Sequence, residues 1–466
     1  MRVKTERSQV AIVKNDGPAN AERIDQMLNE AIDLLGGIKN FVKEGDTVVI
    51  KGNFFSPAPP PVTIDRRLVR ALFRLLKTAN PKSITLVEAV SVGTKLGRLR
   101  TTEWIVEELG IMDVVREEGV NFLPLEKAER VNVEAKGGRC LQHIDYPKIM
   151  LDADVVIDLP CMKTHCQTYV TLGIKNYQGI LTDEQKYHSH REDLSQKLVD
   201  IFRVRLPDLT IVDGLLAMEG DGSDESGIPV QLNTIVVSPD VVAADAVSCA
   251  CMGMKDVLDV TTTRLAQFYG MGNADLDKID VLGTPIDEVV IREFVWPTPY
   301  SKPYDRYAIG VQDNMDVYIG GACRECWHRL RSVNSVLSKF PDRKWTVLLG
   351  SDPKFPPLRE FEGDLENVII FGDCACACGA NVKELRNAML LKGKGLIAPG
   401  CPPFRPALKM LNDYLASLGL QEPSDNKPKF SADQKKAYAY YQKLDPTWIP
   451  KSQREAEAEA DKKEEK

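Results

Sequence analysis

Residues 315–403 contain three short apolar runs, each ended by glycine or proline and followed by cysteine. The runs are 315–319, 366–371 and 395–398. Apolar runs of this length that end in turn-forming residues are typical of buried parallel strands. Because the carboxyl ends of parallel strands share one edge of an open sheet, cysteines that are distant in sequence are expected to meet there. The segment therefore predicts a parallel α/β domain with a thiol site at one edge.

The cysteines that follow these runs suggest a cofactor, since thiolates bind iron–sulfur clusters and zinc. We predict an iron–sulfur cluster of the 4Fe–4S type. Zinc is the alternative cofactor, although the sequence lacks the two CxxC knuckles of a structural zinc ribbon. A third interpretation is that these thiols are buried and inert. The expected ligands are Cys323, Cys326, Cys374 and Cys401, with Cys376 and Cys378 as substitutes for Cys374.

Composition narrows the class of protein. The chain has 466 residues, of which 43% are hydrophobic and 27% charged, and this is ordinary for a soluble protein of two or more domains. Its net charge of −7 argues against a nucleic-acid partner. We expect no membrane span and a cytoplasmic location, because the sequence has neither an apolar run of spanning length nor a secretory signal. A cluster protein of this kind suggests an anaerobic cell.

The first half of the sequence alternates between strand and helix patterns. The runs 46–50 and 83–87 are predicted strands, and residues 65–77 between them have helical spacing. This order is typical of a βαβ unit with parallel strands. Polar residues that follow the two strands are then expected at one sheet edge, where ligands bind. They are Lys51, Asn53 and Glu88.

A denser group of polar residues follows a third predicted strand, 154–158. It contains Lys163 and His165, and then Lys175 and Asn176. Lysine binds anions as a point charge, so this group suits a small substrate with a carboxylate or phosphate. Histidine titrates near neutral pH and can transfer a proton or bind a metal. We therefore expect an anion-binding pocket in the first domain.

Further candidates lie beyond this group. His188 and His190 are expected to contact substrate, and a second metal bound by these histidines with His165 is the alternative. Asp213 ends another predicted strand, and Glu219 begins a glycine-rich acidic loop that could present a carboxylate to a cation or a proton-transfer step. A mobile turn is the other interpretation of this loop.

Several of these blocks occur in an order typical of one family. They are Lys51–Asn53, Glu88, Asp154–Pro160, Lys163–His165, Gly173–Gly179, Ile211–Gly214, Glu219–Gly220 with Gly222, and Asp240 with Asp245. On these residues the region from about 45 to 255 resembles the domain of unknown function 362, a group of largely uncharacterised prokaryotic proteins. The resemblance implies a shared polar pocket and an association with iron–sulfur motifs, without naming a reaction. This chain lacks the tandem ferredoxin runs common in that family.

These observations predict an α/β protein of two domains with mostly parallel sheets flanked by helices, the second smaller and rich in cysteine. The expected division is an anion-pocket domain at 1–295, a proline-rich linker at 296–310, a cysteine-rich domain at 311–420 and a polar tail at 421–466. Within the tail we expect one helix, at 432–444, and a disordered end.

The predicted function is that of an iron–sulfur oxidoreductase acting on a small anionic metabolite. Lys163 and Lys175 would bind the anion, and His165 would transfer a proton. Glu88 and Asp213 would orient these groups, and an electron-donor protein would be the partner. The alternatives are an iron–sulfur or metal-dependent lyase or hydratase, and a non-enzymatic cluster carrier or electron-transfer protein.

Overall fold

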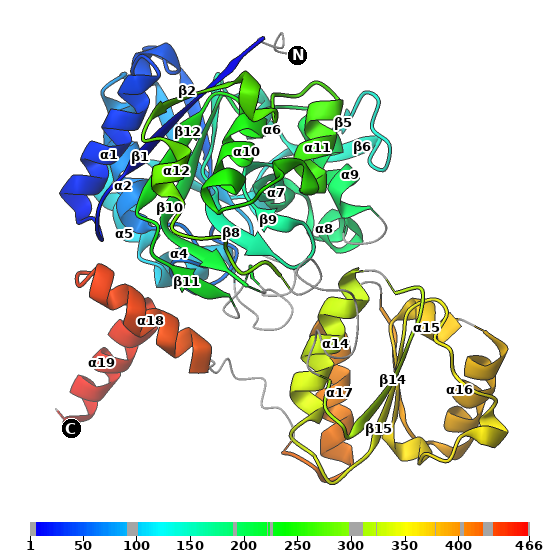
Figure 1. The fold of residues 1–466 in the computed structure, drawn as a ribbon. Helices are drawn as coiled ribbons and strands as arrows, with labels where there is room; N and C mark the ends of the chain where they lie inside the picture. The colour runs from blue at the N-terminus through cyan, green and yellow to red at the C-terminus, as the bar shows by residue number, and fades with distance from the viewer. Residues whose placement is uncertain are drawn as a thin grey trace.

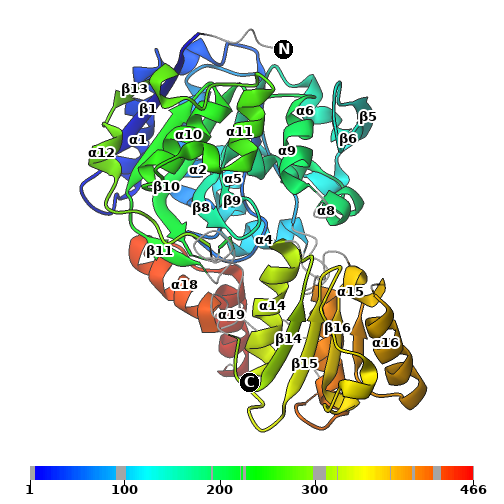
Figure 2. The ribbon, with the colours of Figure 1, turned by 45° about the vertical axis from the view of Figure 1, so that its right-hand side comes forward.

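The computed structural model describes residues 6–90, 101–189, 193–220, 222–223, 227–297, 311–322, 324–377, 379–400, 405–422 and 432–464. In this part of the chain, an 11-stranded sheet forms a first α/β unit and a 4-stranded sheet forms a second. Figures 1 and 2 show the smaller second unit, coloured yellow to orange, beside the first. The predicted fold class, α/β with mostly parallel sheets flanked by helices, is confirmed.

Parallel pairing dominates the large sheet. Along its main path only β12 runs antiparallel to its neighbours, which are β1 and β10. The path is, in spatial order, β13 (Ile279–Gly283), β1 (Ser8–Lys14), β12 (Thr234–Ser238), β10 (Leu209–Glu219), β7 (Val155–Asp158), β2 (Thr47–Lys51), β3 (Ser83–Glu88) and β4 (Asn121–Pro124). The strands beside this path are β8 (Cys161–His165), β9 (Tyr169–Thr171) and β11 (Ile228–Val230). A separate hairpin joins β5 (Arg130–Glu134) to β6 (His143–Pro147).

Helices cover both faces of this sheet, because its central strands are apolar on both sides. In β2, Val48 and Ile50 enter one hydrophobic cluster and Val49 enters the other. The first face is covered by α1 (Ala21–Leu34), α2 (Arg66–Lys77), α4 (Thr102–Glu108) and α5 (Ile111–Glu118). The second is covered by α6 (Lys148–Asp152), α7 (Gly173–Asn176), α9 (Leu194–Phe202), α10 (Val241–Cys251), α11 (Thr261–Phe268) and α12 (Ile286–Val289).

The strand order reverses direction between β2 and β7. From β2 the chain proceeds outward to β3 and β4, and it then returns to place β7 on the other side of β2. In open α/β sheets the crevice beyond the carboxyl ends of such strands is the usual ligand site. The fold therefore marks the ends of β2 and β7 as the place to look for function.

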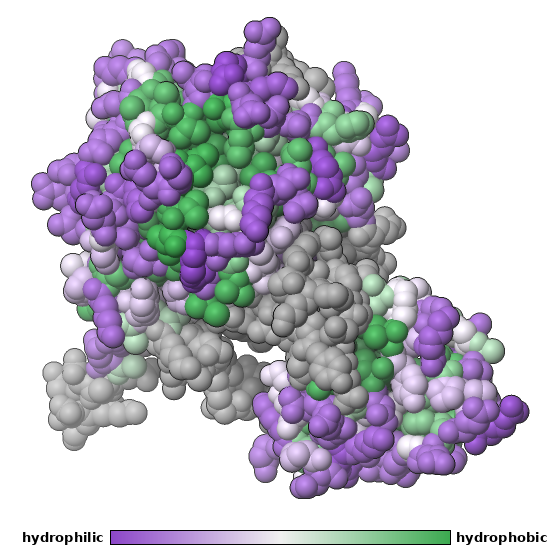
Figure 3. Space-filling model, in the orientation of Figure 1, coloured by the Kyte–Doolittle hydropathy of each residue, from purple (hydrophilic) through white to green (hydrophobic). Residues whose placement is uncertain are grey.

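The second unit has four parallel strands, one of which the sequence analysis missed. Its sheet order is β14 (Met315–Ile319), β15 (Trp345–Leu349), β16 (Val368–Phe371) and β17 (Leu396–Ala398). Helices α14 (Arg324–Leu337) and α17 (Arg405–Ser417) pack on one face, and α15 (Asp373–Ala377) and α16 (Ala380–Lys392) on the other. In the view of Figure 3, most of the coloured surface of this unit is hydrophilic. The unpredicted strand is β15, which separates β14 from β16.

The C-terminal residues return to the first unit. Helix α18 (Ala432–Leu444) matches the predicted helix, but the run expected to be disordered lies largely in a further helix, α19 (Lys451–Glu464). Arg66 at the start of α2 forms a buried ion pair with Asp445, at 2.6 Å from Nε to Oδ2. Trp448 is also buried, and its ring packs edge-on against that of Tyr441. The second unit is thus inserted between two parts of the first.

Asp445→Ala should loosen the docking of α18. The substitution leaves the buried guanidinium of Arg66 without its carboxylate, and breaking a buried ion pair costs about 3 kcal/mol. We expect the opening free energy of α18, measured by hydrogen exchange with mass spectrometry, to fall by that amount. Asp413→Ala is the matched control, since its exposed pair with Lys409 contributes about 0.5 kcal/mol or less. Equal protection of α18 in both variants would contradict the docking.

Candidate functional site

Three charged side chains meet where the strands reverse direction. Lys51, the last residue of β2, is the register partner of Asp158, the last residue of β7. On the other side of β2, Lys51 pairs with Val87, and Glu88 follows directly at the end of β3. The apolar runs fix this register, because a slip of one residue would turn the buried faces outward. The strand ends therefore place a cation between two acids.

Lys51 and Glu88 form a fully enclosed ion pair. The distance from Lys51 Nζ to Glu88 Oε1 is 2.9 Å, and Lys51 is 0% exposed. Nζ also donates to the carbonyl oxygen of Gly52, while the Glu88 carboxylate accepts the backbone N–H groups of Phe54 and Ala89. Buried charges are tolerated when they are paired and their remaining hydrogen-bonding capacity is used. This pair meets both conditions.

Two asparagine amides connect the ion pair to a second buried lysine. Asn176 Nδ2 donates to Asp158 Oδ1 at 2.8 Å, and Asn176 Oδ1 accepts from Asn53 Nδ2 at 2.8 Å. Lys163 Nζ in turn donates to Asn53 Oδ1 at 3.1 Å. Lys51 Nζ also lies 3.4 Å from Asn176 Oδ1. Residues from β2, β3, β7, β8, α7 and the loop after β2 thus form one polar network, the switch-point cluster: Lys51, Asn53, Glu88, Asp158, Lys163 and Asn176.

The loop after β2 closes over Lys163. Lys163 Nζ donates to the carbonyl oxygen of Val62 at 2.6 Å, and it lies 4.5 Å from the centre of the Phe55 ring. The side chain is 0% exposed. An anion could reach this ammonium group only if the loop moved.

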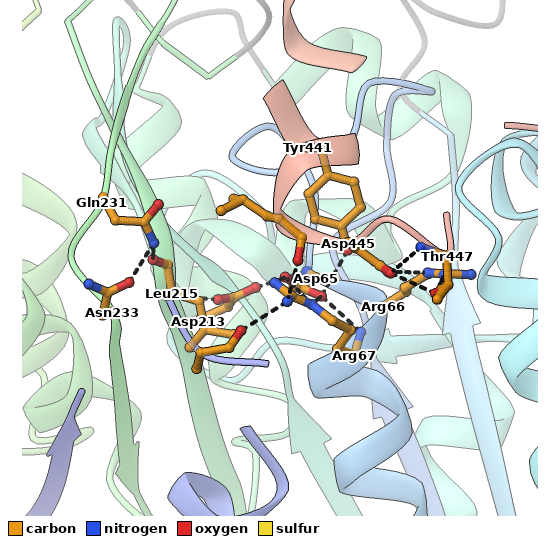
Figure 4. Close-up of polar contacts among 12 residues, drawn as sticks. Asp65, Arg66, Arg67, Asp213, Leu215, Gln231, Asn233, Tyr441, Asp445 and Thr447 are labelled. Atoms are coloured by element: carbon orange, nitrogen blue, oxygen red, sulfur yellow. Dashed lines mark hydrogen bonds and ion pairs between the residues drawn. The ribbon is translucent and has the colours of Figure 1, made fainter. Parts of the chain in front are cut away.

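A second buried polar group lies next to this cluster, centred on β10 (Figure 4). Asp213 accepts hydrogen bonds from the backbone N–H groups of Asp65 and Leu215. Burial first, and then the charge of Asp65, raise the pKa of Asp213 to about 7. Asp65 also binds Arg67, at 2.6 Å from Oδ2 to Nη2, and accepts the Tyr441 hydroxyl at 2.8 Å. Asp213 therefore contacts neighbours other than the lysines it was predicted to orient.

Two buried acids, Asp158 within the cluster and Asp245 beside it, have raised pKa values. Burial raises the pKa of Asp158 well above its usual value, and its Oδ2 has no hydrogen-bond partner among the described residues. Burial also raises the pKa of Asp245 to about 7, although it accepts N–H groups from Gly173 and Ile174. Asp158 was not among the predicted site residues. It ends a predicted strand, so the rule that selected Lys51 and Glu88 could have selected it as well.

The remaining candidates of the first unit have other neighbours. His165 is buried, and its Nδ1 accepts the N–H groups of Gln167 and Thr168, which leaves the proton of a neutral ring on Nε2. Lys175 contacts Gln178. Both oxygens of Glu219 bind Arg292, and Oε2 also accepts the N–H group of Val295, so the chain's own donors occupy this carboxylate. His188 lies in α8 (Asp183–Ser189), and His190 is outside the described residues.

A further buried amine was missed by the sequence analysis. Lys186, also in α8, is buried, and its Nζ lies 3.4 Å from the carbonyl oxygen of Val90. Burial lowers its pKa to about 8, against the opposing effects of Glu88 and Glu126. These neighbours of Lys186 are about 60 to 100 positions away in the sequence, so no local sequence pattern predicts its burial.

The structure covers the predicted cluster ligands only in part. Cys326 is buried on the α14 face of the second sheet, and Cys376 is partly buried on the α16 face. Cys374 is exposed at the start of α15. The predicted ligands outside the described residues are Cys323, Cys378 and Cys401. Within the described ranges, no three His, Cys, Asp or Glu side chains are grouped closely enough to hold a metal ion.

One feature of this edge fits a site shared between two loops. Asp373, next to Cys374, donates its N–H group to the carbonyl oxygen of Gly400 at 3.0 Å. Its carboxylate accepts the N–H group of Gly400 at 2.7 Å. The loops that follow β16 and β17 are therefore hydrogen-bonded side by side. Cys374 follows Asp373 directly, at the start of α15.

Fold and site together define an α/β protein with a closed polar cluster at its topological switch point. A sequence profile described as "Domain of unknown function (DUF362)" matches residues 48–250. A thylakoid-associated protein of Synechocystis sp. is 32% identical over 295 residues, which are 59% of this chain and 85% of that protein. The chain belongs to the DUF362 family, as its residue pattern suggested.

Two solved structures are similar at 13% identity. The lactate racemase apoprotein of Thermoanaerobacterium thermosaccharolyticum gives a TM-score of 0.34 over 55% of this chain and 59% of its own. A protein from Thermotoga maritima gives 0.32 over 83% of this chain and 98% of its own. None of the helices in the described part of the chain combines the length and apolar character needed to cross a bilayer.

Gly179→Ala should strain the Lys51–Glu88 ion pair. A Cβ atom at Gly179 would lie 2.7 Å from Lys51 Nζ and 3.0 Å from Glu88 Oε1. Because the pair is enclosed, we expect the substitution to cost about 1–3 kcal/mol of stability, measured by urea unfolding. Gly17→Ala is the control, since a Cβ there meets nothing within 4 Å. Similar stability losses in both variants would show that Gly179 is not packed against the pair.

Asp245 should give stability a specific pH dependence. Its folded pKa is raised from 3.8 to about 7, so its contribution to stability is complete below pH 3.8 and is lost as the pH rises through 7. Relative to the wild type, Asp245→Asn should therefore gain about 3 kcal/mol between about pH 5 and about pH 8. Urea unfolding at both pH values measures the change, in which any constant effect of the altered hydrogen bonds cancels. A pH-independent difference would exclude a raised pKa.

Proposed function

We propose that this DUF362 protein is an iron–sulfur oxidoreductase that binds a small carboxylated or phosphorylated metabolite at the switch-point cluster. The observation that carries the proposal is the convergence of Lys51, Asn53, Lys163 and Asn176, from separate elements, at the edge where α/β sheets bind ligands. Clustered buried ionisable groups of this kind occur preferentially at functional sites.

Each residue of the cluster has a definite task in this proposal. Lys163 binds the anion, because its ammonium group is held by two neutral oxygens that a more basic anionic oxygen can replace. Lys51, paired with Glu88, supports the amide of Asn176 through its 3.4 Å contact with Oδ1. The amides of Asn53 and Asn176 fix the geometry, and the covering loop keeps water away from the bound metabolite.

The second unit would hold the redox cofactor. Cys374 and Cys326, with the cysteines outside the described residues, would ligate the iron–sulfur cluster, which supplies one-electron transfer when bound. Asp373 supports this assignment, because it joins the loops after β16 and β17. An electron-donor protein is the proposed partner.

The buried acids favour a second candidate from another reaction class. Asp213 has a pKa of about 7, which suits a group that accepts and returns a proton at neutral pH. A lyase or hydratase that removes a proton from an anionic substrate would use such a group. The two candidates differ in whether the reaction changes the oxidation state of the substrate.

Metal analysis and anion binding together test the proposal. The full chain, purified without oxygen, should contain iron and acid-labile sulfide, and its visible spectrum should bleach with dithionite. Phosphate or a small carboxylate should raise the melting temperature, and Lys163→Met should weaken this binding by about tenfold or more. Lys409→Met, at an exposed lysine of α17, is the control.

The outcomes separate the two parts of the proposal. Zinc without iron or sulfide would refute the cluster. Anion binding that Lys163→Met leaves unchanged would refute the pocket. Turnover without any change in substrate oxidation state would favour the lyase or hydratase.

A further inference from the structure

We propose that the C-terminal residues 432–457 act as a clasp that holds the loop 53–64 closed over Lys163 and so controls ligand access to the switch-point cluster. This inference rests on the proposed function only in taking Lys163 as the ligand-binding amine. The clasp lies outside residues 48–250, to which the family profile corresponds.

The loop 53–64 is compact, and it is unusual because nearly all of it is buried. Its ends are joined by the N–H group of Ile64, which donates to the carbonyl oxygen of Asn53, and the Thr63 hydroxyl donates to the carbonyl oxygen of Ala58. Ala58 and Val62 pack against Met218 of β10 in a small hydrophobic cluster. Loops normally lie at the surface, so something must cover the outer side of this one.

Helix α18 contacts both the loop and the residue that follows it. The Tyr438 hydroxyl lies 3.0 Å from the carbonyl oxygen of Pro57, within the loop, and 3.0 Å from Glu108 Oε1, so it bridges the loop and α4. The Tyr441 hydroxyl donates to Asp65, the residue that follows the loop, at 2.8 Å (Figure 4). Trp448 packs edge-on against both tyrosine rings, with centroid distances of 5.2 and 5.1 Å. The inner side of the same loop binds Lys163 through Val62 and Asn53.

The clasp also binds residues outside the loop. Its contacts with the loop can therefore be removed while these other contacts remain. Arg66 binds Asp445, and Ser452 at the start of α19 donates both its N–H group and its hydroxyl to Glu108. Arg454 pairs with Asp113 of α5. Loss of the tyrosine hydroxyls should therefore free the loop while the helices remain docked.

Amine labelling of the full chain tests this directly. The variant Tyr438→Phe/Tyr441→Phe removes both hydroxyls and keeps both rings. We expect acetylation of Lys163 by an N-hydroxysuccinimide ester, quantified by mass spectrometry, to accelerate by about tenfold, because the hydroxyl contacts to the loop and to Asp65 at its end, which favour the closed loop, are lost. The control is Tyr440→Phe, whose hydroxyl belongs to the same helix but lies 3.4 Å from Gln231 and is remote from the loop contacts.

Lys197, buried in α9 on the second face of the sheet, serves as an internal reference for general opening. Faster labelling of Lys163 without a rise at Lys197 supports the proposal. Lys163 labelling within about twofold of the wild type, or an equal rise at Lys197, overturns it. If the double variant does not fold, Tyr438→Phe alone is judged by the same criteria. Labelling needs neither substrate nor cluster, so its failure is distinct from failure of the proposed function.

Discussion

The buried ion pair between Lys51 and Glu88 is the constraint on which the functional edge depends. Two charges removed from water cost several kcal/mol each unless they are paired and their other hydrogen-bonding capacity is used. Lys51 therefore requires β3 beside β2, in the register that brings Glu88 to it, and Glu88 requires the backbone N–H of Phe54. These requirements fix the start of the covering loop. Gly179 packs against the pair so closely that a side chain at this position would collide with Lys51 and Glu88.

Two arginines at the N-terminus of α2 explain why the C-terminal helices pack on the first unit. Helix α2 begins with Arg66 and Arg67 and has no acidic residue in its first turn, although cations are unfavourable near a helix N-terminus. Asp65 offsets Arg67 as the N-cap, and Asp445 offsets Arg66 from the far end of the chain. Without α18, these two guanidinium groups would be only partly compensated. The second unit is therefore an insertion joined to the first by two chain crossings, a more restrained arrangement than a domain on one linker.

Residues at the carboxyl ends of strands could be predicted from the sequence, whereas contacts between side chains far apart in the sequence could not. The positions of Lys51 and Glu88 followed from apolar runs whose carboxyl ends share an edge, and the same rule applied consistently would have added Asp158. The contact between Asp65 and Tyr441 joins residues 376 positions apart, and no sequence pattern around either residue predicts it. The docking of the tail on the first unit was not predicted, because its charge suggested solvation, whereas aromatic residues such as Trp448 provide the contacts.

The cysteine edge shows how an unpredicted strand changes a site without excluding it. Because β15 lies between β14 and β16, the end of β14, which precedes α14 with Cys326, is about 10 Å, or two strand spacings, from the end of β16, which precedes α15 with Cys374. A group with ligands from both helices would therefore lie beyond the end of β15. Residue 350, directly after β15, is a glycine whose Cβ would collide with the carbonyl oxygen of Gly320 at 2.3 Å. The segments that follow β14 and β15 therefore pack backbone against backbone at this point, where only glycine fits.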